Sequence, residues 1–405
     1  AGSLPVYVSQ DGDHTETAAV ARRHRVTLWQ RPRKPLLRPG QPGQAYLAQH
    51  YKWAFDRLFF ERNHSYAVVV EDDMLFSPDF LRFFEQTAPL LQADPSLWCV
   101  STWNDNGFDD LVSEDDASRL FRTDFFPGLG WMLRRELWAE LSPRFPLEHW
   151  DHWMRLRSTN KGRDCVVPRV ARNYNIGVNG ANMQSSQYNR YLKRIRYNRR
   201  ASVQLRDVDA ILSDAYEADM ATLVTAAAAA PQSIETSPAT LANHASPVLY
   251  TYTADTFARL ANHFRIWTVP RATHRHTAVL RYRNTTFVLA SSRWSPYLPA
   301  HLRTAMPASA RLVAADVGQS CDAACQREGR RCAAEHFEFA NQVERLREAF
   351  PCENGYATVT GPDIPNYVVE QQNEYAGRCL VSEGGYTCTA RHRATRRLCP
   401  CDETL

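Results

Sequence analysis

The sequence predicts a mixed α/β fold with a mostly parallel sheet, followed by a small α+β unit and a cysteine-rich module. Three observations carry this prediction. Short apolar runs alternate with stretches of helical periodicity between Pro5 and Thr102, which is typical of strands joined by helices. The run Tyr66–Val70 is wholly apolar, as in a strand covered on both faces, and it ends in the three carboxylates of Glu71–Asp73. Eight of the ten cysteines follow residue 320.

The elements of the first unit follow from this alternation. Apolar residues in Ala45–Phe60 recur at the spacing of one helical face. Ser77, Pro78 and Asp79 combine a capping serine, a first-turn proline and an acidic residue, so a helix should begin there. Prolines and glycines make Arg31–Gly43 a loop. We expect strands at Pro5–Ser9, Val26–Trp29, Tyr66–Val70 and Trp98–Thr102, and helices at Thr15–His24, Ala45–Phe60, Ser77–Leu91 and Leu205–Ala226.

A change in composition marks the end of this unit. An alanine-rich stretch from Thr225 is followed by a Pro/Ser/Thr-rich segment to about Ser237, which is typical of a linker. Beyond it, strands are expected within Val248–Thr253 and Thr277–Leu289, around a helix at Asp255–Phe264. We therefore predict three domains, at residues 1–230, 231–300 and 301–405.

The composition excludes some classes of protein. At 405 residues, with 44% hydrophobic and 23% charged residues, the chain can bury a globular core. Its net charge of +4 does not indicate a nucleic-acid-binding protein, and we interpret the basic segment Arg190–Arg200 mainly as a solvated helix face. No apolar run approaches the ~20 residues that span a bilayer. Contact with a membrane is thus expected only through an anchor outside this sequence.

Two acidic sites are candidates for chemistry. Glu71, Asp72 and Asp73 follow a strand, where ligands of open α/β sheets bind, and adjacent carboxylates repel one another unless a cation lies among them. Hard oxygen ligands suit Mg²⁺ or Mn²⁺, although a solvated acidic turn is the alternative. Asp11 follows another strand. Asp151 lies between aromatic residues, where desolvation would make it a better general base, although an aspartate near tryptophan is more often a cap or an ion-pair partner.

The cysteines indicate an oxidising compartment. Cys99 and Cys165 are isolated, whereas the other eight are crowded near the C-terminal end. This density is typical of a disulfide-stapled module of a secretory protein, and sequons at Asn63 and Asn284 agree with that compartment. Zinc binding is the competing interpretation, but the spacing of the cysteines lacks a second ligand pair. Because the sequence shows neither signal peptide nor anchor, we expect a trimmed ectodomain.

Several segments resemble one family in their order along the chain. They resemble the β-1,2-N-acetylglucosaminyltransferase I family, and they are VSQDG (Val8–Gly12), AQHYKWAF (Ala48–Phe55), VVVEDDM (Val68–Met74), ADPSLWCVSTWNDNG (Ala93–Gly107), RTDFFPGLGW (Arg122–Trp131), ELWAELSPRFP (Glu136–Pro146), WDHWMR (Trp150–Arg155) and KGRDCVVP (Lys161–Pro168). The resemblance implies a GT-A fold, a UDP-GlcNAc donor, Mn²⁺ as cofactor and inversion at the anomeric carbon. The implied acceptor is O2 of an α-linked mannose on a glycoprotein glycan, and the implied location is the Golgi lumen.

The resemblance also implies roles for individual residues. Asp73 would bind the metal and Asp151 would be the general base, with Trp150 beside the acceptor. The residues that would contact the donor are Glu71 at the sugar, Asp72 at the ribose, Asp11 at the uracil and His50 at the nucleotide. The resemblance also implies a disulfide between Cys99 and Cys165.

Two departures from the family pattern concern the donor. Ala181 and Asn182 stand in the closing loop where the family has a valine and a serine, so their contacts to the diphosphate differ. The family's first strand, with an arginine that frames uracil, has no counterpart before Ala1, which leaves the expected uracil pocket incomplete. The alternative functions are a transferase of the same fold with another UDP-sugar donor or an O-mannosyl acceptor, and a glycan-binding protein without catalysis.

The C-terminal segment resembles a second family. Gln319–Cys332, Gly377–Cys388 and Arg396–Cys401 are similar to the C-terminal module of N-acetylglucosaminyltransferase V. The resemblance gives this module no catalytic residue. Its eight cysteines allow 105 disulfide connectivities, among which the sequence does not choose.

Overall fold

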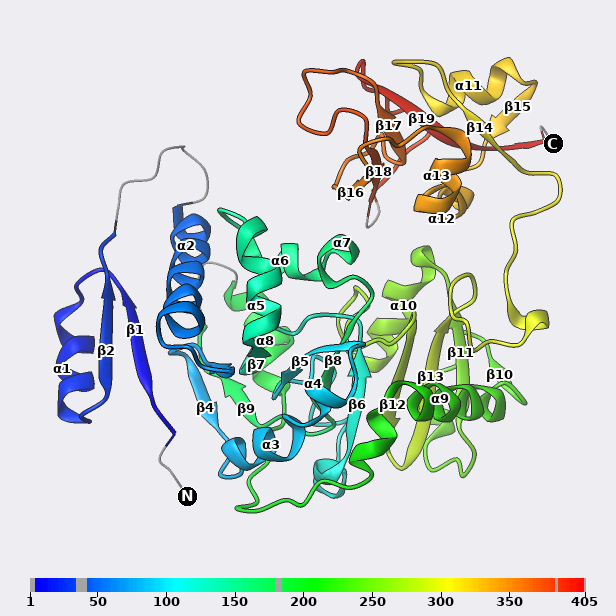
Figure 1. Cartoon of the computed structure of the whole chain (residues 1–405). Helices are drawn as coiled ribbons and strands as arrows, with labels where there is room; N and C mark the ends of the chain where they lie inside the picture. Colours follow the sequence, from blue (N-terminus) through cyan, green and yellow to red (C-terminus); the bar gives the residue numbers. More distant parts are fainter. Residues whose placement is uncertain (1–3, 34–41, 179–183, 383–384, 404–405) are drawn as a thin grey trace.

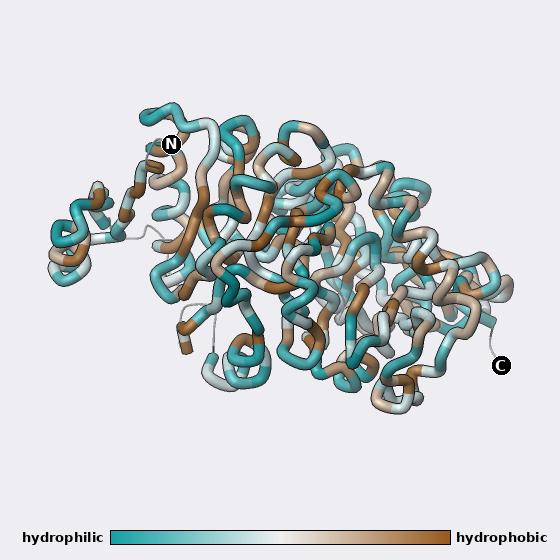
Figure 2. The backbone as a smooth tube through the Cα atoms, turned by 90° about the horizontal axis from the view of Figure 1, so that it is seen from below, coloured by the Kyte–Doolittle hydropathy of each residue, from teal (hydrophilic) through white to brown (hydrophobic). Residues whose placement is uncertain are grey.

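The computed structural model of the chain describes residues 4–33, 42–178, 184–382 and 385–403 (Figure 1). It confirms the predicted class, a mixed α/β fold followed by a disulfide-rich module. The β1–α1–β2 unit lies at one side of the molecule and the C-terminal module at the other, and Figure 2 shows the two termini toward opposite ends. Among the described residues, no helix is both long enough and apolar enough to cross a membrane.

The N-terminal unit is a parallel pair of strands joined by a helix. Strands β1 (Tyr7–Asp11) and β2 (Thr27–Arg31) pair in register, and α1 (Thr15–Arg23) connects them. The helix begins after His14, whose ring accepts a hydrogen bond from the backbone N–H of Thr17. Asp11 and Arg31 are register partners at the end of the pair, which brings their side chains together.

The central unit is a five-stranded sheet flanked by helices. The pair β5–β8 is parallel and the other pairs are antiparallel, so antiparallel pairing is more extensive here than we predicted. In sheet order the strands are β3 (Tyr66–Val69), β7 (Trp131–Arg134), β5 (Leu97–Ser101), β8 (Asp164–Pro168) and β6 (Leu120–Thr123). The helices of this part are α2 (Pro42–Asp56), which continues as a π-helix to Glu61, α3 (Phe80–Thr87), α4 (Leu90–Ala93), α5 (Arg135–Leu141), α6 (Trp150–Arg155), α7 (Arg157–Asn160), α8 (Ser185–Arg190) and α9 (Ser213–Ala227).

Strand β3 has apolar neighbours on both faces although it lies at an edge of the sheet. Ala67 and Val69 pack into a cluster with Phe55 of α2, whereas Val68 packs into the cluster that contains Phe83 of α3. This two-sided packing explains why the strand has no polar alternation. The chain then leaves the sheet and returns as β4 (Met74–Phe76), which pairs with β9 (Asn173–Asn175).

The predicted start of the helix after this strand is wrong in detail. Ser77 does not cap it, because α3 begins at Phe80, and the serine hydroxyl donates to the carboxylate of Asp79 instead. Asp79 also accepts from Arg172 Nε at 3.0 Å, and both side chains are buried. The carboxylate therefore balances a buried arginine from a distant segment, a contact that local patterns do not encode.

The second unit is a four-stranded sheet with a helix on each face, one of them α9, which packs against Leu249 and Val288. The hairpin between its last two strands turns at Arg283 and Asn284, which both have positive φ, as a two-residue type I′ turn requires. The sheet order is β10 (Pro231–Gln232), β11 (Val248–Tyr252), β13 (Thr285–Ser291) and β12 (Thr277–Tyr282), with α10 (Ala254–Phe264) packed against it.

The basic segment Arg190–Arg200 is only partly the solvated helix face that we expected: Arg190, Lys193, Arg199 and Arg200 are exposed, but the segment is not a continuous helix. Helix α8 ends at Arg190, and the apolar residues that follow, Leu192 and Ile195 among them, are buried in the core shared with the second sheet. Arg194 donates to Asp110 at 2.9 Å. The segment thus joins two sheets because its aromatic and aliphatic residues need burial and its arginines find acidic partners.

The C-terminal module is held by four disulfides. Its sheet has the order β14 (Arg311–Ala314), β19 (Thr395–Glu403), β17 (Asn366–Val368), β18 (Cys379–Val381) and β16 (Tyr356–Thr358), with β15 (Arg330–Cys332) also paired to β19, and its helices are α11 (Cys321–Arg327), α12 (Phe337–Ala340) and α13 (Val343–Ala349). The bridges are Cys321–Cys399, Cys325–Cys401, Cys332–Cys388 and Cys352–Cys379.

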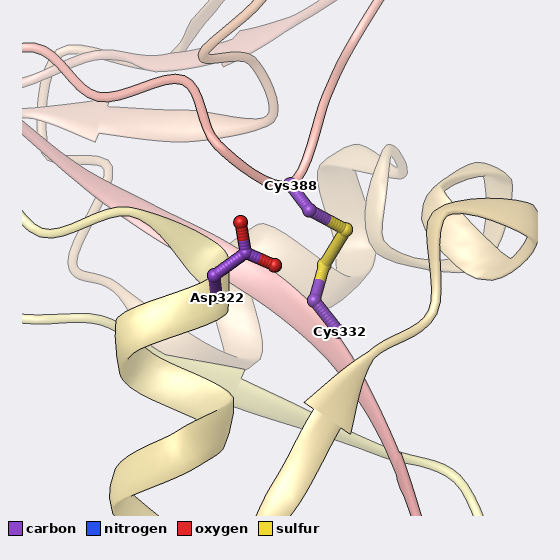
Figure 3. Close-up of side chains that lie close together, drawn as sticks. All are labelled: Asp322, Cys332 and Cys388. Carbon is purple, nitrogen blue, oxygen red and sulfur yellow. A yellow bond between two sulfur atoms is a disulfide. The ribbon is translucent and has the colours of Figure 1, made fainter.

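These bridges exclude zinc binding by the cysteines of the module. Within the described residues, one group of three potential metal ligands has its atoms close together, namely Asp322, Cys332 and Cys388. Figure 3 shows that the two sulfurs of this group are bonded to each other. A disulfide has no thiolate to offer a metal.

Candidate active site

The acidic segment lies between β3 and β4, and within it Asp73 is held by contacts of both its side chain and its backbone. Asp73 Oδ2 accepts a hydrogen bond from Asn175 Nδ2 at 3.0 Å, while its Oδ1 is buried and has no protein partner. The backbone N–H of Ile176 donates to the carbonyl of Asp73 at 2.8 Å. The pairing of β4 with β9 therefore fixes the carboxylate and leaves one oxygen available.

The surroundings of Asp73 fit a hard cation. Burial raises the pKa of Asp73, with the charge of Asp72 adding to it and the Asn175 bond opposing it, so a positive charge would be stabilised there. A methyl group on Gly177 would lie 2.1 Å from Asp73 Oδ2, so the close approach requires glycine. Glu71 and Asp72 do not converge with Asp73 on one point within the described residues. A cation here would have Asp73 as its protein ligand and take its other ligands from water or substrate.

Glu71 is held by a tyrosine of helix α2. The hydroxyl of Tyr51 donates to Glu71 Oε1 at 2.8 Å. Burial raises the pKa of Glu71 to about 7, the Tyr51 bond opposes this rise, and the charges of Asp73, Asp72 and Asp151 add to it. The structure thus brings Asp151, from a distant segment, close enough to act electrostatically on the acidic segment.

Asp151 lies in the first turn of α6. Arg155, one turn later, donates to Asp151 Oδ2 at 3.1 Å, whereas Oδ1 is buried without a partner. Arg155 itself is anchored by a bond from its Nε to the carbonyl of Phe126 at 3.2 Å. The aspartate is therefore an ion-pair partner, and it also keeps an oxygen free to accept a proton.

Trp150 is a core residue. It is 3% exposed, and its ring stacks on Tyr51 at 4.2 Å between centroids and on Trp131 at 6.1 Å. The indole therefore supports Tyr51 and the start of α6 from within, and its face is covered by aromatic neighbours.

Asp11 and His50 lie together near the end of β1. Asp11 accepts from Arg31 at 2.6 Å and from Arg33 at 3.1 Å. His50 Nε2 lies 2.7 Å from the hydroxyl of Ser9, and burial lowers the pKa of this histidine. The region therefore offers two cations and an imidazole favoured in its neutral form. Ala181 and Asn182 lie outside the described residues.

A fifth disulfide lies in the central sheet. Cys99 of β5 and Cys165 of β8 are adjacent across the parallel pair and form a disulfide, the pairing that the resemblance implied. The bridge ties β5 to β8, and the chain segments before and after β8 carry Asp151 and Asn175.

The chain is similar in sequence to two families of known proteins. The GNT-I family matches residues 1–300. The chain belongs to the GNT-I family. Residues 297–401 match glycosyltransferase family 18, so the GNT-I family chain carries a segment similar to a second transferase family.

A characterised relative of this GNT-I family chain is known from Arabidopsis thaliana. It is an alpha-1,3-mannosyl-glycoprotein 2-beta-N-acetylglucosaminyltransferase and is 40% identical over 203 residues. The match covers 49% of this chain and 45% of that protein, so the matched part spans less than half of the relative's length.

Sequence reasoning missed several residues of the site in this GNT-I family chain. Tyr51 was counted only among the apolar residues of a helical face, although it stands in the quoted segment AQHYKWAF. Arg31 and Arg33 were assigned to a loop. Asn175 carries no local signal, because its role depends on the pairing of β4 with β9.

Proposed function

We propose that this protein is an inverting glycosyltransferase that moves GlcNAc from UDP-GlcNAc to O2 of an α-linked mannose on glycoprotein glycans, with Mn²⁺ as cofactor. One observation carries the proposal. Asp73 Oδ1 and Asp151 Oδ1, from two distant segments, are both buried without a hydrogen-bond partner. The charges of both carboxylates add, after the larger effects of burial and of Glu71, to the rise in the pKa of the Tyr51 hydroxyl. This arrangement supports a metal-binding carboxylate and a general base in one site, which is what an inverting transfer to a hydroxyl requires.

The residues have separate roles in this proposal. Asp73 holds the cation, which when bound supplies positive charge to the diphosphate leaving group. Glu71 and Asp72 contact the donor sugar and ribose. Asp151 Oδ1, buried and without a protein partner, accepts the proton of the acceptor hydroxyl. Arg155 keeps the carboxylate in place through the other oxygen.

The nucleotide contacts of the proposal lie at β1. Asp11 faces the uracil and His50 the nucleotide, while Arg31 and Arg33 hold the Asp11 carboxylate in one orientation. Ala181 and Asn182 contact the diphosphate. Trp150 contributes to the acceptor side from within the core, through its stack on Tyr51 and its place next to Asp151.

The organisation and location follow from the same reasoning. We propose a catalytic domain at residues 1–230, a small α+β domain at 231–300 and the disulfide module at 301–405. The five disulfides of the described residues fit the oxidising lumen of the secretory pathway, and we propose the Golgi as the compartment.

An assay with defined donors and acceptors tests this function. The purified protein is incubated with Mn²⁺, a mannosyl acceptor glycan and UDP-GlcNAc, UDP-GalNAc, UDP-xylose or UDP-Gal in turn, and products are read by mass spectrometry. We expect one HexNAc added from UDP-GlcNAc, with the β-1,2 linkage determined by NMR. Transfer from another UDP-sugar would show that the proposed donor is wrong. Transfer to an O-mannosyl peptide alone would show that the proposed acceptor is wrong. No transfer at all would favour a glycan-binding protein without catalysis.

A further inference from the structure

We propose that Tyr51 is a positioning residue that holds the donor side and the acceptor side of the site through two different parts of its side chain. This inference rests on the proposed function. Its hydroxyl orients Glu71, and its ring supports the turn that carries Asp151. Helix α2 thereby couples the two halves of the site, which otherwise come from separate segments of the chain.

The hydroxyl of Tyr51 makes the contact on the donor side of the site. Tyr51 Oη lies 2.8 Å from Glu71 Oε1, a distance typical of a hydrogen bond to a carboxylate. Glu71 follows the end of β3 and has no strand partner of its own, so a side-chain contact is needed to fix it. With Oε1 held by Tyr51, the other oxygen, Oε2, is left to accept a hydrogen bond from a hydroxyl group of the donor sugar.

The ring contact addresses the acceptor side. The Tyr51 ring stacks on Trp150 at 4.2 Å with an interplanar angle of 30°, and Trp150 directly precedes Asp151. Phe126 and Trp131 also pack against Trp150, so the indole is enclosed on several sides. The stack therefore fixes the first turn of α6. A shift of this turn would displace Asp151, and the bond from Arg155 holds only one of its two oxygens.

A purely structural role does not account for both contacts. Tyr51 is 8% exposed, so its ring contributes to the core, but a core position alone would be filled as well by phenylalanine. The hydroxyl is directed into the acidic segment and donates to a carboxylate. Burying this polar group is favourable only because it has that partner.

Two variants separate the two contacts. Tyr51→Phe keeps the ring and removes the hydroxyl, whereas Tyr51→Leu also removes the stack on Trp150. Binding of UDP-GlcNAc in the presence of Mn²⁺ is measured by calorimetry, and KM and kcat are measured separately for donor and acceptor. We expect Tyr51→Phe to weaken UDP-GlcNAc binding about tenfold, the effect of losing one hydrogen bond to a charged group, with the acceptor KM unchanged. We expect Tyr51→Leu to lower kcat and raise the acceptor KM as well.

Tyr250→Phe is the matched control. Tyr250 is buried in β11 and its hydroxyl donates to the carbonyl of Thr236 at 2.9 Å, so the same atom is removed at a position in the second sheet, away from the site. UDP-GlcNAc binding that is equal in wild type and Tyr51→Phe would overturn the inference, and so would equal losses in the Tyr51 and Tyr250 variants. If Tyr51→Leu fails to fold, the Tyr51→Phe measurement still decides. Failure of the wild type to bind UDP-GlcNAc or to transfer GlcNAc would instead contradict the proposed function.

Discussion

Asn175 donates a hydrogen bond of 3.0 Å to the carboxylate of Asp73, although the two residues lie 102 positions apart in the chain. The carbonyl oxygen of the same amide accepts from the backbone N–H of Gly177 at 2.9 Å. One side chain thus fixes both the carboxylate proposed to bind the metal and the glycine that leaves room beside it. The antiparallel pair of β4 and β9 brings them together.

Gly177→Ala should weaken metal binding without unfolding the protein. The added methyl group would lie 2.1 Å from Asp73 Oδ2, so the carboxylate must move away. We expect a loss of Mn²⁺ affinity of about tenfold or more, measured by calorimetry, with an unchanged melting temperature. Gly361→Ala is the control, because its methyl group would meet its nearest atoms at an ordinary 3.4 Å. Unchanged Mn²⁺ binding in Gly177→Ala would contradict the placement of the metal at Asp73.

Asp151→Asn should remove catalysis and keep substrate binding. An amide retains the shape of the carboxylate and its acceptor for Arg155, but it does not take up a proton at neutral pH. We expect kcat to fall at least about a hundredfold, the lower end of the contribution of a general base. Binding of UDP-GlcNAc with Mn²⁺ should be unchanged. The exposed Asp219 provides the control Asp219→Asn, and near-normal turnover in Asp151→Asn would make the base assignment wrong.

His274 should make the stability of the protein depend on pH. It is 2% exposed and lies between Asp164, 3.3 Å from its Nδ1, and Glu217, 2.9 Å from its Nε2. Burial alone lowers the pKa of His274, but these two carboxylates outweigh burial and raise it above 6.5. The resulting stability is complete below the unfolded pKa and is lost as the pH rises through the folded one.

Unfolding in denaturant at pH 5.5 and at pH 8.5 measures this effect. We expect the wild type to lose stability between the two values and His274→Gln to show a smaller change, with a loss of about 2 kcal/mol at pH 5.5 from the missing charged hydrogen bond to Glu217. The exposed His301 supplies the control His301→Gln. A His274→Gln variant that keeps the full wild-type pH dependence would show that other groups cause it.

Glu338 should hold the disulfide module against the rest of the chain. Its carboxylate accepts from the backbone N–H of Ala254 at 2.7 Å, at the start of α10, and from Arg293 at 3.0 Å. Both charged side chains are buried, so removing one leaves the other unpaired at a cost of about 3 kcal/mol. We expect Glu338→Ala to separate the unfolding transition of the module in calorimetry and to expose the connecting segment to protease.

Exposed Glu344 in the same module gives the control Glu344→Ala. The disulfides of the module should remain intact in both variants, which mass spectrometry under non-reducing conditions verifies. A single unfolding transition at the wild-type temperature in Glu338→Ala would contradict the role of this pair.

Local patterns in the chain were enough to predict the fold class, the position of β3 and the acidic segment after it, because apolar periodicity and charge at a strand end are local properties. Ordered motifs also indicated the family. The sequence pattern left the sheet pairing and the disulfide connectivity of the module open. It also did not reveal that Leu192 and Ile195, within the basic segment Arg190–Arg200, are buried.

The contacts between distant segments depend on the packing of the whole fold. Asn175 reaches Asp73 through the pairing of two short strands, and Arg172 meets Asp79 in the core. Tyr51 lies between Glu71 and Trp150 because α2 packs beside the end of β3, which no spacing in the sequence reveals. The physical reason is common to all three: each contact joins segments distant in the chain, and its partner is set by packing around buried polar groups.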